Sequence, residues 1–422
     1  NSPTMCQMFV HRALQPVRER FANTIVYHYM DNILFCREQA FEMADINKIN
    51  RDLSQSGLVI GPEKIQRTDP WHYLGWVVTK NHIRPQKLQL HTDLHTLHDV
   101  QKLLGDLQWV RQLAGISNAD LAPLMPLLQG TDPAQPVHLT GDQRQCLDRL
   151  EKQLAVSVAN RRLPDIPLGI LIVNAGDAPF PLLCCTGGKQ AKRSVDEICI
   201  LEWVFPPTTP PQSIWQRTQV LAHLICKARA RTVDISGLEP TFISLPIRTE
   251  IREWLIGHSE ALQTALVGFT GQIIERYPVD PRLQVIMRQQ WVEEPKMKNR
   301  PVQGITVFTD AGRKKKLAAC TWMHAGQWEH HIIPGTNDDS LQTLELTAVA
   351  WALVHWQTEA INIVTDSLYV TGVVLRIEQA LVKRPANKRL SQLFGQVQRA
   401  IQAHTQPGAI LHIRSHMFIE GL

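Results

Sequence analysis

The stretches GITVFTDAG at 304–312, SLQTLELTAVA at 340–350 and INIVTDSLYV at 361–370 decide the fold of the C-terminal part of this chain. The first and third are short β-prone runs with alternating apolar residues, and both reach a Thr-Asp pair. We expect a turn after the first run, at Ala311-Gly312. In the second stretch, leucine and valine recur near helical spacing behind Ser340, a residue that favours a helix N-cap. The order strand, hairpin, helix, strand predicts an α/β domain.

Each of these stretches carries one carboxylate, namely Asp310, Glu345 and Asp366. Ligands of open α/β sheets gather at the carboxyl ends of strands, so we expect both aspartates there with the glutamate beside them. A cluster of carboxylates is costly unless cations hold it together. Two divalent ions in such a cluster can cut a phosphodiester. Taken singly, each aspartate has a simpler interpretation as a turn residue.

The full arrangement resembles the type-1 ribonuclease H domain, a mixed five-stranded sheet with helices. The resemblance implies that Asp310, Glu345 and Asp366 are catalytic and bind two Mg²⁺ ions, with Mn²⁺ as the alternative ion. The run ILHIRSH at 410–416 is similar to the last strand and mobile histidine of the family, which gives His416 a role in proton transfer or product release.

The same resemblance places further residues beside the site or against the nucleic acid: Gln342, Ser367 and Tyr369. The family has a fourth carboxylate in a G-N-x-x-A-D helix, and we expect it to be absent because the sequence stops at Leu422.

The run IVYHYMDNILFC at 25–36 predicts a β-hairpin joined at Asp31-Asn32. Its centre, YMDN, is similar to the Y-M-D-D box of retroviral reverse transcriptases, in which carboxylates bind the two Mg²⁺ ions of nucleotidyl transfer. Asp31 matches the first aspartate of the box, and Asn32 replaces the second. Because an amide supplies no charge, we expect weaker divalent binding and a defective polymerase site, of which Asp31 is a catalytic remnant.

The runs at 57–64 and 71–76 resemble the end of the palm and the primer-grip hairpin, and the run at 100–109 resembles the thumb helix. That helix has one apolar stripe, which consists of Val100, Leu103, Leu104, Leu107 and Val110. Gln101, Gly105 and Trp109 recur every four residues and form a second stripe. The amide of Gln101 can form hydrogen bonds, Gly105 lets the backbone come close, and the ring of Trp109 can stack. These properties suit a duplex with a wide minor groove. The simpler alternative is a surface helix with an isolated tryptophan.

Composition indicates a globular chain, because 44% of the residues are apolar and 20% are charged. The net charge is only +5, so basicity has to be local. Basic runs at 296–300, 313–316 and 383–389 are either phosphate contacts or solvated turns. The eight cysteines lack metal-site spacing, which favours reduced thiols in an intracellular, non-secreted protein. We find no signal peptide and no apolar run long enough to span a membrane, so we expect no membrane as a partner.

We predict four domains: a palm remainder with primer grip at 1–80, a helical thumb at 81–155, a ribonuclease H-like connection at 160–300, and the ribonuclease H domain at 301–422. The whole resembles a retroviral Pol polyprotein from an endogenous retrovirus of the K group or an alpha- or betaretroviral relative, truncated at both ends. The implied partners are an RNA–DNA hybrid, a template–primer duplex and a second reverse-transcriptase chain in a homo- or heterodimer.

Three hypotheses about activity follow. The first is a nuclease that cuts the RNA strand of a hybrid by a two-metal mechanism. The second is a non-catalytic relic that still grips duplexes through the thumb stripe and the basic runs. The third is an unstable fold whose uncovered apolar face favours aggregation.

Overall fold

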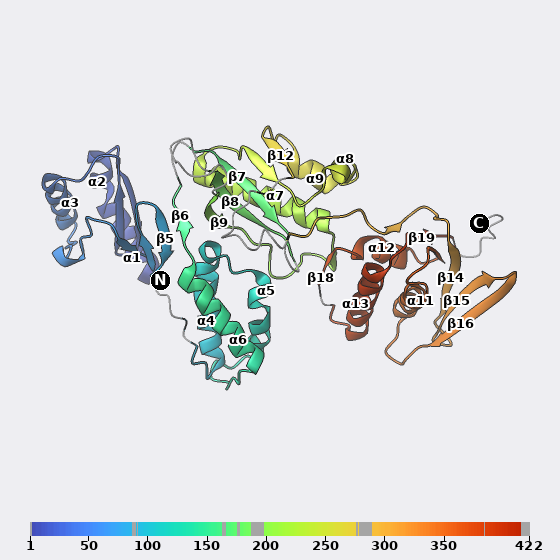
Figure 1. Ribbon diagram of the computed structural model, residues 1–422. Helices are drawn as coiled ribbons and strands as arrows, with labels where there is room; N and C mark the ends of the chain where they lie inside the picture. The colour runs from blue at the N-terminus through green and yellow to red at the C-terminus, as the bar shows by residue number, and fades with distance from the viewer. Residues whose placement is uncertain are drawn as a thin grey trace. The chain divides into compact units, whose positions relative to one another are not determined.

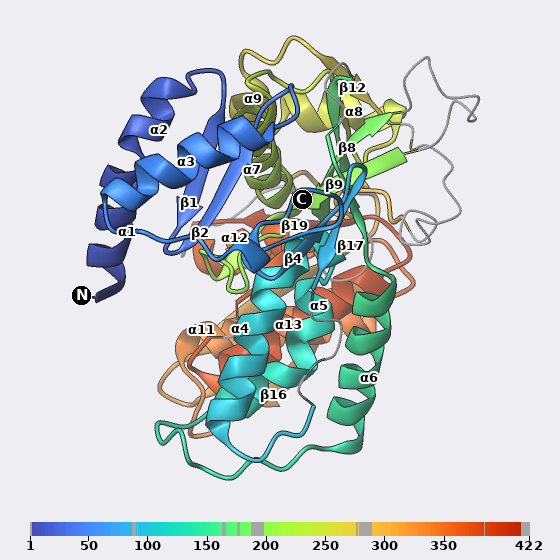
Figure 2. The ribbon, with the colours of Figure 1, turned by 90° about the vertical axis from the view of Figure 1, so that its left-hand side faces the viewer.

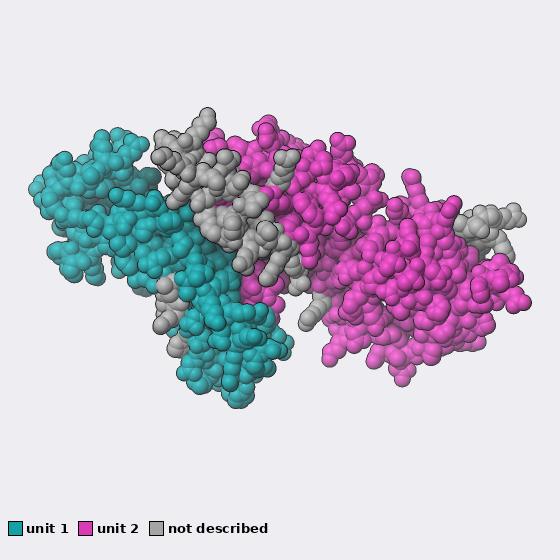
Figure 3. All heavy atoms as spheres, viewed as in Figure 1, with its two compact units in different colours: residues 1–116, 123–163 teal, residues 117–122, 164–422 magenta. Residues whose placement is uncertain are grey.

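The chain folds into two compact units (Figure 3). The computed structural model describes residues 2–86, 90, 92–162, 166–174, 178–186, 198–275, 277, 289–383 and 385–414. Unit 1 comprises 1–116 and 123–163, and unit 2 comprises 117–122 and 164–422. His416 lies outside the described residues.

Unit 1 contains a hairpin, a small sheet and the long helices of the predicted thumb (Figure 1). Its elements are α1 (Ser2–Ala13), α2 (Gln15–Arg20), β1 (Ile25–Tyr29), β2 (Asn32–Cys36), α3 (Met43–Gln55), η1 (Pro62–Lys64), β3 (Trp71–Tyr73), β4 (Trp76–Val78), β5 (His82–Pro85), α4 (Leu97–Ala114), η2 (Ala122–Leu128, which begins at the unit boundary), α6 (Gly141–Val156) and β6 (Ala159–Asn160).

Unit 2 contains two larger sheets and their helices. Its elements are α5 (Asn118–Leu121), β7 (Leu168–Val173), β8 (Phe180–Thr186), β9 (Ile198–Trp203), β10 (Ile214–Trp215), α7 (Arg217–Ser236), β11 (Phe242–Ser244), α8 (Thr249–Gly257), α9 (Glu260–Leu266), β12 (Gln272–Ile274), β13 (Met297–Lys298), β14 (Ile305–Gly312), β15 (Leu317–His324), β16 (Gln327–Pro334), α11 (Leu341–His355), β17 (Ile361–Thr365), α12 (Leu368–Ile377), β18 (Leu381–Val382), α13 (Lys388–Ala403) and β19 (Gly408–His412).

The predicted hairpin at 25–36 is present, but its turn lies one residue earlier than predicted. Tyr29 pairs with Asn32, so the turn falls on Met30-Asp31 and not on Asp31-Asn32. The turn is held there because the Met30 N–H donates to Oε1 of Gln7 at 2.6 Å, with Met30 at a φ of 55°. Helices α1, α2 and α3 gather around the hairpin and bury one of its faces (Figure 2).

The apolar stripe of α4 is buried as its spacing predicts. Thr96 caps the helix and accepts a hydrogen bond from the Asp99 N–H at 3.3 Å. Gly115 ends it with a φ of 70°, the left-handed conformation that glycine adopts at low cost. One detail differs from the prediction: Val110 is only half-buried, and Arg111 is buried beside it.

The region after residue 164 forms a sheet of order β12-β11-β7-β8-β9, covered by α7, α8 and α9. Strand β7 is buried along its whole length, which explains its unbroken apolar sequence. All eight cysteines of the chain lie in the described residues, and none forms a disulfide. Among the described residues, no helix is long and apolar enough to span a membrane.

The C-terminal sheet is mixed, as predicted, with the order β13-β19-β17-β14-β15-β16. Strands β14, β17 and β19 are parallel to one another, while β15 and β16 continue the sheet as antiparallel strands. Helices α11 and α12 pack on this sheet, α13 packs against these two helices, and residues of all three belong to one apolar core. The two-residue strand β13 adds a sixth strand to the predicted five.

A short antiparallel ladder ties the two sheets of unit 2 together. Ile214 of β10 pairs with Val382 of β18, and the Lys383 N–H donates to the Ser213 carbonyl at 3.0 Å. Ile214 is 6% exposed and belongs to the apolar core of the C-terminal sheet. A residue from the predicted connection therefore completes the predicted nuclease domain.

Candidate active site

Two neighbouring parallel strands place Asp310 and Asp366 side by side. Thr309 of β14 is the partner of Thr365 of β17, and an aspartate follows each threonine. The hydroxyl of Thr309 donates to the Val364 carbonyl at 3.2 Å, which adds a side-chain bond between the two strands.

Strand β14 is longer than the sequence predicts. The predicted turn at Ala311-Gly312 is wrong, because β15 supplies hydrogen-bonding partners as far as the pair Gly312 and Leu317. Asp310 therefore lies within the strand, opposite Ala319, and is exposed. The basic residues at 313–316 make the turn instead.

Helix α11 carries the third carboxylate. Ser340 caps the helix by accepting from the Thr343 N–H at 3.3 Å, as its position in the sequence predicts. Glu345 follows in the second turn and is half-buried. The hydroxyl of Ser367 donates to Oε2 of Glu345 at 2.6 Å. This hydrogen bond joins the glutamate to the segment that directly follows Asp366.

The two aspartates act electrostatically on Glu345. The pKa of Glu345 is raised, first by burial and then by the negative charges of Asp366 and Asp310. The hydrogen bond from Ser367 acts in the opposite direction and favours the ionised form. The glutamate thus lies within electrostatic range of both aspartates, and a cation would relieve the repulsion.

The donor chemistry of this cluster suits a hard divalent cation, because Mg²⁺ and Mn²⁺ prefer carboxylate oxygens. Within the described residues, however, no three His, Cys, Asp or Glu side chains lie close enough to hold one ion as they stand. The residue types fit the ion, and their side chains would have to close in on it.

The remaining predicted nuclease residues divide into three cases. Gln342 is exposed on the first turn of α11. Tyr369 is half-buried against the core, and burial raises its pKa. Ser367 bonds Glu345 and also caps α12 by accepting from the Val370 N–H at 3.3 Å.

One site-adjacent residue was missed at the sequence level. Nε2 of His412 donates to the Asp366 carbonyl at 3.2 Å, and His412 is the register partner of Thr365. The only signal in the sequence is its position on the last strand, opposite the strand that ends before Asp366.

Basic residues from all three predicted runs are partly engaged inside the protein. Arg389 donates from Nε to buried Asp339 at 2.9 Å. Nζ of Lys316 donates to the Asn337 carbonyl at 2.9 Å, and Nζ of Lys296 donates to the Gln402 carbonyl at 2.6 Å. These three cations therefore have structural roles, and the run at 383–389 includes Arg384, outside the described residues.

In unit 1, the predicted polymerase remnant lies at the tip of the hairpin. Asp31 is exposed in the turn, and Asn32 begins β2. The Asn32 amide donates to Oδ1 of Asp31 at 3.4 Å. The Asn32 amide thus donates to one oxygen of Asp31, at the position where the Y-M-D-D box has a second negative charge.

The second stripe of α4 is exposed as predicted, at Gln101, Gly105 and Trp109. The Trp109 side chain is 58% exposed and stacks on Trp76, with ring centroids 6.2 Å apart and an interplanar angle of 27°. A Cβ atom added at Gly105 would meet nothing within 4 Å. The stripe is therefore open to a ligand along about two turns of the helix.

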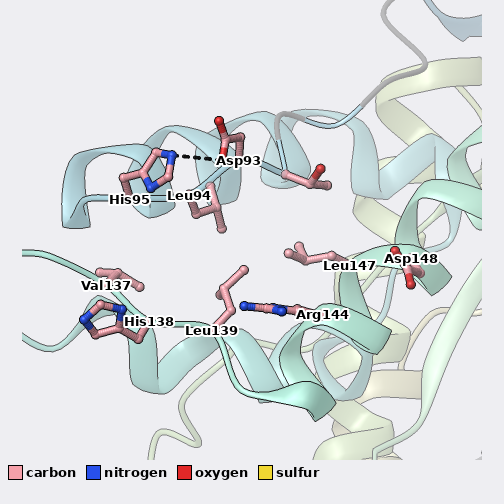
Figure 4. A pocket seen from close by; sticks show the side chains of 10 residues that line it. Asp93, Leu94, His95, Val137, His138, Leu139, Arg144, Leu147 and Asp148 are labelled. Carbon is pink, nitrogen blue, oxygen red and sulfur yellow. Dashed lines mark ion pairs between the residues drawn. The ribbon is translucent and has the colours of Figure 1, made fainter.

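Unit 1 also has a cavity of about 500 Å³ between the segments 92–95 and 137–148. Nε2 of His95 lies 2.9 Å from Oδ1 of Asp93 on one side, and His138 and Arg144 lie on the facing side (Figure 4). None of the predicted site residues lines it.

Comparisons with known families agree with this architecture. Four family models match consecutive parts of the chain: reverse transcriptase (RNA-dependent DNA polymerase) over 1–78, the reverse transcriptase thumb domain over 85–148, the ERVK-8-like, RNaseH-like domain over 190–283, and RNase H over 302–420.

Retroviral polyproteins match over almost the whole chain. The Gag-Pro-Pol polyprotein of Sheep pulmonary adenomatosis virus is 32% identical, over 100% of this chain and 24% of the relative. The Intracisternal A-particle Pol-related polyprotein of Mouse intracisternal a-particle MIA14 is also 32% identical, over 99% of this chain and 46% of the relative. The Gag-Pol polyprotein of Rous sarcoma virus is 31% identical, over 100% and 25%. The chain thus spans about a quarter to a half of these relatives.

Fold and matches together define a multidomain protein of the reverse transcriptase and ribonuclease H class. Within that class, the chain belongs to the retroviral Pol family, and its relatives are betaretrovirus-like. The predicted family and the predicted mixed α/β fold are confirmed.

Proposed function

We propose that this chain hydrolyses the RNA strand of an RNA–DNA hybrid at the cluster of Asp310, Glu345 and Asp366. The observation that carries the proposal is the convergence of three elements: the Thr309–Thr365 register aligns the two aspartates, and the 2.6 Å bond from Ser367 brings in the glutamate. The match of the RNase H family model to 302–420 supports the same reaction class.

The residues of the cluster have distinct tasks in this proposal. Asp310 would hold the metal from β14, Asp366 from the residue after β17, and Glu345 from α11. Bound Mg²⁺ or Mn²⁺ would act as a Lewis acid on the phosphodiester and would lower the pKa of a bound water. Ser367 donates a hydrogen bond to Oε2 of Glu345, so Oε1 would be the oxygen available to an ion. His412 braces the backbone of Asp366.

We further propose that the chain lacks RNA-directed DNA polymerase activity. Support comes from Asn32, whose amide replaces a charge in the Y-M-D-D-like box and contacts Asp31. Incubation with a primed template, dNTPs and Mg²⁺ is expected to give no extension, with a working reverse transcriptase as the positive control. Extension by the wild-type chain would overturn this proposal.

A second candidate function is a duplex-binding relic without catalysis. The observation in its favour is that, across the described part of the chain, no three potential ligands are close enough to hold one ion as they stand. The exposed stripe of α4 would remain available for duplex binding.

A second reverse-transcriptase chain is the protein partner that the family implies, and light scattering of the purified chain tests for such a dimer.

The deciding experiment is cleavage of a labelled RNA–DNA hybrid in Mg²⁺ and then in Mn²⁺. Asp310→Asn removes a proposed ligand, and Asp338→Asn removes the same charge from an exposed loop residue as the matched control. Cleavage that is lost only in Asp310→Asn supports the nuclease. Hybrid binding without cleavage in either metal supports the relic. Cleavage that survives Asp310→Asn would refute the proposed site.

A further inference from the structure

An ion pair between a buried carboxylate and a partly exposed guanidinium lies directly before the helix that carries Glu345. The side chain of Asp339 is fully buried, with 0% exposed. Its Oδ2 accepts from the Thr336 N–H at 2.8 Å and from the Thr336 hydroxyl at 2.9 Å. Burial opposes ionisation of Asp339, but these bonds and the bond from Arg389 outweigh it and lower the pKa to about 2. Asp339 is therefore a carboxylate throughout the neutral range.

Arg389 reaches this carboxylate from the first turn of α13. Its Nε donates to Oδ1 of Asp339 at 2.9 Å, and the guanidinium side chain is 28% exposed. Its Nη2 also contacts the hydroxyl of Thr347 at 3.5 Å. That hydroxyl in turn donates to the Thr343 carbonyl at 2.7 Å. One planar guanidinium thus touches two points of a neighbouring segment, a geometry that lysine cannot reproduce.

These two points lie on either side of Glu345 in the sequence. Asp339 directly precedes the N-cap Ser340, and Thr347 lies two residues beyond Glu345. A shift or rotation of α11 would break at least one of the two contacts. The apolar core between α11 and α13 already holds the helices together, but apolar packing alone tolerates small displacements.

We propose that Arg389 and Asp339 are positioning residues, which set the axial position and rotation of α11 and thereby place Glu345 against Asp310 and Asp366. The inference rests on the proposed nuclease function. Neither residue is proposed to touch the substrate. Because an ion pair at a partly buried site adds little net stability compared with apolar packing, the main contribution of this pair is geometric.

The test compares Arg389→Met, Arg389→Lys and the double variant Asp339→Asn with Arg389→Met. The double variant avoids an uncompensated buried carboxylate, so it stays folded if Arg389→Met alone does not. Arg399→Met is the matched control, because Arg399 is exposed on the same helix and has no ion pair or hydrogen bond within the described residues. Four quantities are measured: kcat and KM on a labelled hybrid, hybrid affinity in EDTA, and Mn²⁺ affinity of the hybrid-free chain.

The double variant is expected to lose about 10- to 100-fold in kcat and in Mn²⁺ affinity, the range seen when groups that orient metal ligands are removed. KM and hybrid affinity in EDTA should stay within about twofold, because the nucleic-acid surface is untouched. Arg389→Lys should fall between the double variant and wild type, and Arg399→Met should match wild type.

The possible results separate this inference from the proposed function. Equal kcat and Mn²⁺ affinity in the double variant and in Arg399→Met would overturn the positioning role. If the wild-type chain binds Mn²⁺ but cleaves nothing, the proposed function fails, and Mn²⁺ affinity alone decides the positioning role. If the wild-type chain neither cleaves nor binds Mn²⁺, both are overturned.

Discussion

The hydroxyl of Ser367 donates a 2.6 Å hydrogen bond to Oε2 of Glu345 while its oxygen accepts from the Val370 N–H. One side chain therefore caps α12 and orients a carboxylate on α11. The bond also favours the ionised form of Glu345, against burial and the charges of Asp366 and Asp310. Ser367 thus acts on both the geometry and the charge of the cluster.

Ser367→Ala is expected to lower hybrid cleavage by about 10- to 100-fold, as for other partners that orient metal ligands. Loss of the bond should raise the pKa of Glu345 further, so the acidic limb of the rate profile should move to higher pH. Cleavage rates measured from pH 5 to pH 9 check both effects.

The control for Ser367→Ala is Ser259→Ala. Ser259 caps α9 in the same way, by accepting from the Leu262 N–H at 3.3 Å, but it contacts no carboxylate of the cluster. Both changes should cost about 1 kcal/mol of cap stability. Only Ser367→Ala should change the pH profile, and an equal change in Ser259→Ala would show that the effect is merely one of helix stability.

Glu345→Gln is expected to stabilise the metal-free protein at neutral pH. The folded-state pKa of Glu345 is raised above 4.5, its ordinary value. The contribution of Glu345 to the free energy of unfolding is therefore fully present below the unfolded-state pKa and is lost as pH rises through the folded-state pKa. The glutamine variant escapes that loss. Its melting temperature in EDTA should exceed that of wild type at pH 7.5 and equal it at pH 4, where Glu345 is protonated.

Added Mg²⁺ should shrink this difference, because a bound cation favours the ionised glutamate. Glu359→Gln, which removes an exposed carboxylate beyond the end of α11, is the control. A melting temperature of Glu345→Gln below that of wild type at pH 7.5 would contradict the argument.

Gly105→Ala should have opposite effects on stability and on binding. No atom lies within 4 Å of the added methyl group, and alanine favours a helix over glycine by about 0.5–1 kcal/mol. The same methyl group would keep a duplex from approaching the backbone between Gln101 and Trp109. We expect resistance to urea to rise and duplex affinity to fall, with an unchanged salt dependence because no charge is altered.

Gly257→Ala at the end of α8 provides the control for this change. That position is also open, with no atom within 4 Å of an added Cβ. It should affect stability to a similar degree without any loss of duplex affinity. Unchanged affinity in Gly105→Ala would remove this stripe from the binding surface.

Local sequence patterns predicted the elements that carry the carboxylate cluster. Contacts with distant segments decided where some of these and other elements end. Short stretches of sequence predict the cap at Ser340, the apolar stripe of α4 and the two strands that carry Thr309 and Thr365, and the structure contains all three. The extension of β14 to Gly312 depends on pairing with β15, and the position of the turn at Met30 depends on Gln7 of α1. Neither partner can be identified from local periodicity.

The role of Arg389 was hidden for the same reason. A run of Lys and Arg predicts either a phosphate contact or a solvated turn, and nothing nearby in the sequence points to Asp339. Ile214 is a second case, because a two-residue strand has no recognisable pattern and its partner lies in a distant part of the chain. The predicted division at residues 300 and 301 cuts through the contacts that Ile214 makes.

Ile214→Ala should therefore destabilise the C-terminal sheet although the residue lies in the predicted connection. The side chain is 6% exposed in the core of that sheet, so truncation should cost about 2–5 kcal/mol. Native-state hydrogen exchange measures the result locally, and protection should fall in β14 and β17. Ile170→Ala, in the core around β7, is the matched control and should reduce protection in β7 and β8 instead. If both variants lowered protection only in β7 and β8, the β10–β18 ladder would not couple the two sheets. If Ile214→Ala lowered protection in β14 and β17, residues 213–215 would be an integral part of the nuclease domain.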